Sequence, residues 1–115
     1  MNWKFIRLEL GSTGEFPAGS VSRAYLLRLP LDASDVVDSA TLTRSAAKAT
    51  VRRHWSAEAD QRGFLVSSAG DWAMRCGGSC DRVLHLDGKP MRLGQQVSVV
   101  EPDGTVLPFK VASVR

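Results

Sequence analysis

Turn signals that recur about every eight to twelve residues constrain the fold of this chain more than any other feature. Between them lie short segments in which apolar and polar side chains alternate, which is the period of a strand with one buried face. This spacing is typical of antiparallel pairing and not of βαβ units. The pattern therefore predicts a mainly β fold, a single-domain antiparallel β-barrel or sandwich of about seven or eight short strands.

Two segments carry the clearest local signals. The tripeptide Pro102-Asp103-Gly104 separates two alternating runs, and it predicts a tight hairpin because proline presets the first turn position and glycine accepts a positive φ. The other segment spans residues 21–31, where Pro30 marks the strand's end or an edge position. In that segment we expect one face to carry Val21, Tyr25, Leu27, Leu29 and Leu31.

Two short helical interruptions are predicted between the strands. Asp38 precedes an alanine-rich stretch and suits the N-cap of a short helix. Ser56 reads as a second N-cap, with Glu58 in the first turn and Gly63 ending one helical turn. Between the two, residues 49–55 are compatible with a strand.

The composition bounds the class of protein. With 115 residues, 43% of them apolar and 23% charged, the chain is expected to form one globular domain over residues 1–115. Its apolar runs are far shorter than the roughly 20 residues of a membrane span, and residues 1–10 read as a strand instead of a signal peptide. We therefore expect a cytoplasmic protein without membrane association. Because the edges of small β domains pair readily, a homodimer is also expected.

A basic and aromatic cluster is the first candidate site. Arg52, Arg53, Trp55 and Arg62 combine phosphate-binding guanidinium groups with a ring that can stack on a base, as in proteins that bind single-stranded RNA. The competing interpretation is a solvated, salt-bridged edge with Trp55 packed into the core. The net charge of +3 is mild, and the excess of 11 arginines over 4 lysines is also what codon bias in a GC-rich genome produces.

A glycine-rich segment with two thiols is the second candidate. Cys76 and Cys80, together with His85, offer ligands for a metal such as zinc, with a fourth ligand from His54 or Asp81. The two thiols alone suit a redox switch. The simpler interpretation is a hairpin turn that carries two incidental cysteines, because two cysteines are a weak signature of either site.

No motif for catalysis is present in the sequence. It contains no G-x-S-x-G elbow, no H-E-x-x-H and no phosphate-binding G-x-x-x-x-G-K-[ST]. We therefore expect no cofactor and a non-catalytic small β-barrel that acts as a binding or interaction module in the cytoplasm. The alternatives are single-stranded nucleic-acid (RNA) binding and a thiol or metal site.

Several segments resemble a family of small uncharacterised bacterial proteins that are all-β. The resemblance extends over most of the chain, and it implies an all-β fold without implying any activity, cofactor or site residue. The segments that carry it are Trp3–Leu8, Tyr25–Leu31, Val51–Trp55 and Pro102–Gly104, with Pro108 and Phe109.

Overall fold

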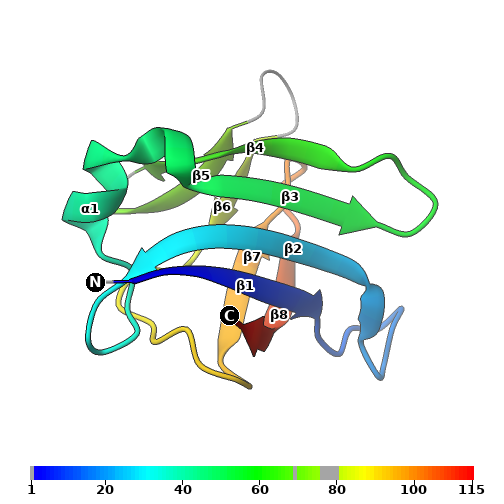
Figure 1. The fold of residues 1–115 in the computed structure, drawn as a ribbon. Helices are drawn as coiled ribbons and strands as arrows, with labels where there is room; N and C mark the ends of the chain where they lie inside the picture. Colours follow the sequence, from blue (N-terminus) through cyan, green and yellow to red (C-terminus); the bar gives the residue numbers. More distant parts are fainter. Residues whose placement is uncertain (1, 69, 76–80) are drawn as a thin grey trace.

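The structure is a closed antiparallel barrel of eight strands, each paired with its neighbours in chain order (Figure 1). It is a computed structural model that describes residues 2–68, 70–75 and 81–115. The expected β class is confirmed, and the architecture is a barrel instead of a two-layer sandwich. The strands are β1 Asn2–Leu10, β2 Ser20–Leu31, β3 Thr50–Trp55, β4 Gln61–Ser68, β5 Asp71–Arg75, β6 Arg82–Leu84, β7 Gln96–Val100 and β8 Val106–Val114.

Pairing between the first and last strands closes the barrel. β1 pairs with β2 along its whole length and with β8 from Ile6↔Val114 to Leu10↔Phe109. Each of the eight described strands is therefore paired on both sides. No described strand offers the free edge on which the expected homodimer depended, and the homodimer itself stays a prediction.

The inward-facing side chains form the hydrophobic core. Tyr25, Leu27, Leu29 and Leu31 are buried as the alternation of β2 requires, but Val21 is 72% exposed. The expectation for Val21 is wrong because the register shifts at the start of β2, where consecutive β1 residues pair with Ala24 and then Ser20 and so break the alternation. The core also includes Ile6, Leu8, Leu10, Val51, Leu65, Met74, Leu84, Leu86, Val97, Val99, Phe109 and Val111.

One short helix and one 3-10 turn interrupt the meander. The helix α1, Ser39–Arg44, lies beside the end of β2 (Figure 1) and is followed by the 3-10 turn Ala46–Lys48. Asp38 caps it as expected, because its Oδ1 accepts a hydrogen bond from the backbone N–H of Thr41 at 3.1 Å. Within the described ranges, no helix is both long and apolar enough to cross a membrane.

The segment after β3 forms a hairpin turn and no helix, so the expected helical turn ending at Gly63 is wrong. The backbone N–H of Glu58 donates to the carbonyl of Trp55 at 3.0 Å, and Ala57 adopts a φ of 65°. β4 begins at Gln61, and Gly63 pairs with Val51 inside it. Ser56 and Glu58, which the sequence predicts at a helix start, lie in this hairpin turn. The pairing of β3 with β4 decides the local structure.

The tight turn between β7 and β8 is confirmed. The backbone N–H of Glu101 donates to the carbonyl of Thr105 at 2.8 Å, and Gly104 has a φ of 87°. Asp103 accepts a further hydrogen bond from the N–H of Thr105 at 2.9 Å. The turn therefore uses the residues that its geometry demands.

A buried polar cluster ties β2 and β6 to the residue that follows β7. The Tyr25 hydroxyl donates to Oε1 of Glu101 at 3.3 Å, and Nε of Arg82 donates to Oε2 of the same carboxylate at 2.6 Å. The Tyr25 ring meets Phe109 edge to face at 5.1 Å between centroids. Burial of Tyr25, reinforced by the charge of Glu101, raises the pKa of its hydroxyl well above the ordinary value of 10.0.

We predict that Tyr25 keeps its proton in the folded protein at pH values where the unfolded chain loses it. The folded protein then binds more protons, so the free energy of unfolding falls as the pH rises through and beyond 10.0. Tyr25 is the only tyrosine, so tyrosinate absorbance reports it alone. Denaturant unfolding of Tyr25→Phe should show a shallower alkaline decline than the wild type. Native titration near 10.0 would contradict this account.

Candidate nucleic-acid interface

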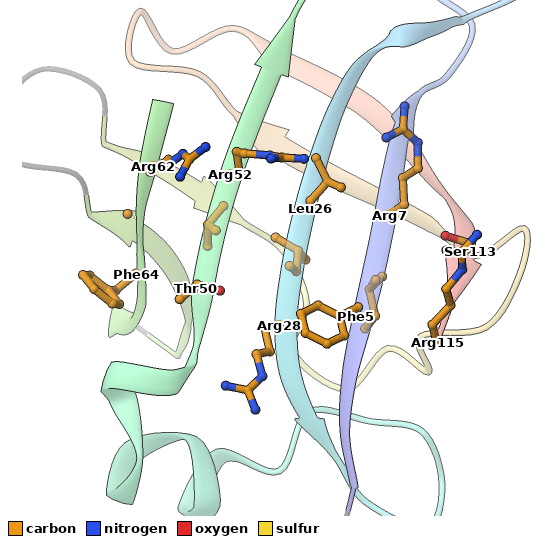
Figure 2. A pocket seen from close by; sticks show the side chains of 14 residues that line it. Phe5, Arg7, Leu26, Arg28, Thr50, Arg52, Arg62, Phe64, Ser113 and Arg115 are labelled. Carbon is orange, nitrogen blue, oxygen red and sulfur yellow. The ribbon is translucent and has the colours of Figure 1, made fainter. Parts of the chain in front are cut away.

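A basic groove of about 780 Å³ lies on the outer wall of the barrel, across β1, β2, β3, β4 and the end of β8 (Figure 2). Five of its fourteen lining residues are arginines, and none is acidic. Because inward and outward positions alternate along each strand, the arginines and phenylalanines that the strands contribute to the groove come from outward positions. The five arginines are Arg7, Arg28, Arg52, Arg62 and Arg115.

The first part of the groove is a straight row of side chains, which we call the arginine row. Arg7 of β1 pairs with Leu26 of β2, Leu26 pairs with Arg52 of β3, and Arg52 pairs with Arg62 of β4. Figure 2 shows these four side chains next to one another across the wall. The register thus places three guanidinium groups on four adjacent strands at one level of the barrel.

The second part is the next row along the strands, which we call the phenylalanine row. Phe5 of β1 pairs with Arg28 of β2, and Thr50 of β3 pairs with Phe64 of β4. Arg28 and Thr50 come one position beyond the pair Leu27↔Val51, which completes the row. Phe5 is 62% exposed and Phe64 47% exposed. Two large exposed rings therefore lie on the same face as the five arginines.

Both rows continue onto β8 because that strand closes the barrel. Ser113 pairs with Arg7 and extends the arginine row. Arg115 extends the phenylalanine row, since two backbone hydrogen bonds of 2.7 and 2.8 Å join it to Phe5. The arginine row therefore spans five strands, and the phenylalanine row spans four strands and the residue after β8. Rows of this width exist only because the first and last strands are neighbours.

Two carboxylates at the border of the groove pair with two of its arginines. Nε of Arg7 donates to Oε2 of Glu9 at 2.7 Å, while Nε of Arg52 lies 3.7 Å from Oδ2 of Asp60. The hydrogen bond between Asp60 and Nδ1 of His54 is the main cause that lowers the pKa of Asp60, and Arg52 adds to it. The other arginines of the groove form no ion pair within the part of the chain that the structure describes. They are Arg28, Arg62 and Arg115.

Arg28 is the groove arginine that has a buried donor, its Nε, without a hydrogen-bond partner among the described residues. Its guanidinium carbon lies 5.2 Å from the centre of the Trp3 ring and 5.7 Å from that of Phe5. Arg28 is thus held beside two aromatic faces, and its terminal NH groups, not the buried Nε, are the donors that a ligand can reach.

The structure divides the four basic and aromatic residues expected to act together. Arg52 and Arg62 are cross-strand partners in the arginine row. Arg53 and Trp55 face the other way, and Arg53 is only 6% exposed. Its NH1 donates to Oε1 of Glu58 at 3.2 Å, and its guanidinium carbon lies 4.1 Å from the centre of the Trp55 ring. Arg53 and Trp55 therefore pack at the edge of the core. This agrees with the competing interpretation of the sequence, in which Trp55 packs into the core.

The other residues of the groove escape sequence reasoning because they come from separate strands. Phe5 and Arg7 lie on β1, Arg28 on β2 and Phe64 on β4. Each occupies an outward position in its own alternating segment, so the sequence of each strand indicates that the residue faces outward. Only the register between strands shows that these positions meet.

The thiol and metal candidates are only partly described. Cys76 and Cys80 lie outside the described residues. Nδ1 of His85 lies 2.8 Å from Oδ2 of Asp71, a carboxylate contact of the kind that also orients histidine ligands of metals. In the described ranges, no group of three or more histidine, cysteine and acidic side chains is placed to hold a metal ion. The role of the three residues as ligands stays a prediction.

The position of His85 favours a structural role. It follows β6 at the end of the β5–β6 pair where Asp71 begins β5, whereas Arg75 and Asp81 lie at the opposite end of that pair. Oδ1 of Asp71 accepts hydrogen bonds from the backbone N–H groups of Trp72 at 3.1 Å and Leu86 at 2.9 Å. The carboxylate therefore fastens the segment after β6 to the start of β5.

Comparisons with protein-family models, with curated proteins and with solved structures found no match. The resemblance to a family of small bacterial proteins consequently stays an expectation.

We predict that Asp71→Ala lowers the free energy of unfolding by about 1–3 kcal/mol, because it removes the carboxylate that accepts from the backbone N–H groups of Trp72 and Leu86 and contacts His85. The matched control is Asp87→Ala, which removes an exposed carboxylate of the same segment and should change stability by less than about 0.5 kcal/mol. Denaturant unfolding measures both variants. Equal effects would contradict the fastening role of Asp71.

Proposed function

We propose that this protein is a non-catalytic module that binds single-stranded nucleic acid, RNA in particular, on the outer wall formed by β1–β4. The observation that carries the proposal is the parallel arrangement of the arginine row and the phenylalanine row on one face. Nucleic-acid binders that lack base specificity combine the same two elements, a positive track for the backbone and aromatic platforms for bases.

The arginine row supplies the electrostatic part of binding. A guanidinium group is planar and donates two parallel hydrogen bonds to a phosphate, and the groove contains five arginines and no lysine. Neutralising phosphates releases counterions, so the affinity falls steeply with salt. Glu9 and Asp60 occupy only two of the five arginines, which leaves a positive face for a polyanion.

The phenylalanine row favours a nucleic acid over other polyanions. An acidic peptide or inorganic polyphosphate uses the arginines but has no flat π-surface for Phe5 and Phe64, whose exposed rings are well suited to stacking. The hydroxyls of Thr50 and Ser113 lie on the same face, where they can bond a ribose 2′-hydroxyl. RNA therefore matches every kind of group in the groove.

We predict that the wild-type protein binds a fluorescent single-stranded oligouridylate at low salt, as measured by anisotropy. The logarithm of the affinity should fall linearly with the logarithm of the salt concentration. Arg52→Ala and Arg62→Ala should each weaken binding and reduce the magnitude of the slope by about 0.7, the value for one phosphate contact on a single strand. Anisotropy that stays flat at low salt would contradict the proposal.

Two control variants distinguish the effect of the groove arginines on binding from effects of net charge and of protein stability. Arg92→Ala removes the same charge from an exposed arginine that pairs with Asp35 away from the groove, so the slope should not change. Arg53→Ala removes a buried arginine, so it should lower stability without altering the slope of the folded protein. A slope change with Arg92→Ala as large as with Arg62→Ala would show that binding is not localised to the groove.

A further inference from the structure

The two rows have a geometry that can be compared with the dimensions of a nucleic-acid strand. Phe5 on β1 and Phe64 on β4 belong to the same row, and along the wall their backbones are separated by three strand spacings, roughly 14 Å. The arginine row runs parallel to it, two residues further along each strand, at a distance of roughly 6.7 Å. This offset is comparable to the separation between a phosphate and the base of its own nucleotide.

Resting on the proposed function, we infer that the bound strand crosses the β-strands at right angles. Its phosphates follow the arginine row, and its unpaired bases follow the phenylalanine row. The opposite arrangement, a strand running along one β-strand, would meet only one ring, because Phe5 and Phe64 lie on different strands. Crossing the wall is the path that uses both rings and all three guanidinium groups of the arginine row together.

The distance between the two rings sets the length of the recognised segment. Stacked bases on one strand are about 3.4 Å apart, and three bases stacked between the two rings make four such steps, because each end base also stacks on a ring. Four steps cover the roughly 14 Å between Phe5 and Phe64. The rings therefore stack on the first and third bases of a three-nucleotide segment.

Arg28 and Thr50 lie between the two rings in the phenylalanine row. Nε of Arg28 is buried, so the donors that a base can reach are its terminal NH groups, which form no ion pair among the described residues. Every nucleobase carries ring-nitrogen or carbonyl acceptors, so a donor here binds the middle base without selecting its identity. The ligand class is thus an unpaired, sequence-tolerant stretch of at least three nucleotides.

The experiment measures how oligouridylates of two, three, four and six nucleotides compete with a fluorescent longer oligouridylate at low salt. The steepest gain in affinity is expected between two and three nucleotides, because only the longer one reaches both rings. Phe5→Leu and Phe64→Leu keep an apolar side chain and remove the ring, and each should weaken the trinucleotide by at least about 5-fold. Each variant should also abolish the gain from two to three nucleotides.

Three comparisons complete the test. Leu93→Ala alters an exposed apolar residue away from the groove and should leave affinity unchanged, and thermal melting should show that both phenylalanine variants are folded. Inorganic polyphosphate with the same number of charges should bind the wild type and the phenylalanine variants equally. Duplex RNA should bind more weakly than the single strand, because its bases are not free to stack.

The possible failures are distinguishable. If no oligonucleotide binds at low salt, the proposed function itself is wrong. If oligouridylates bind but the phenylalanine variants behave like the wild type, or if duplex RNA binds as tightly as the single strand, the crossing path is wrong and the groove binds polyanions by charge alone.

Discussion

The pairing of β1 with β8 is the constraint on which the structure depends. It turns a meander of short strands into a closed barrel, in which every described strand has two neighbours. In a closed barrel, alternate residues of each strand point into the core, and the residues between them point to solvent. The buried contact of Tyr25 and Arg82 with Glu101 joins further strands inside the same ring.

The proposed interface follows from the same constraint. Antiparallel register brings outward residues of four strands into rows, and closure adds β8 to those rows through Ser113 and Arg115. The chain has a net charge of only +3, yet it concentrates five arginines without an acidic residue in one groove. The distribution of charge over the surface, more than its sum, makes a polyanion a plausible ligand.

Much of the fold was predictable from local signals, because strand alternation and turn residues act over short distances. The hairpin at Pro102–Gly104 and the cap at Asp38 are of this kind. Local reasoning failed after Trp55, where residues that suit a helix cap serve a hairpin turn, and at Val21, where a register shift changes which face a residue occupies. Both outcomes depend on partners distant in the sequence.

The candidate site was predictable only in part for the same reason. Arg52 and Arg62 were found because β3 and β4 are adjacent in the chain. Phe5 and Arg28 required knowledge of how β1 pairs with β2. Arg53 and Trp55 were grouped with the arginines by proximity in sequence, although neighbouring residues of a strand point to opposite faces.

The most direct test of the central claim is a nitrogen-proton NMR spectrum of the protein titrated with a short oligouridylate at low salt. The account predicts shifts concentrated at the backbone amides of the two rows, with the largest at Phe5, Arg28, Arg52 and Phe64. Residues at the buried cluster, such as Tyr25, should shift little. Shifts that cluster at Arg53 and Trp55, or that spread evenly over the barrel, would contradict it.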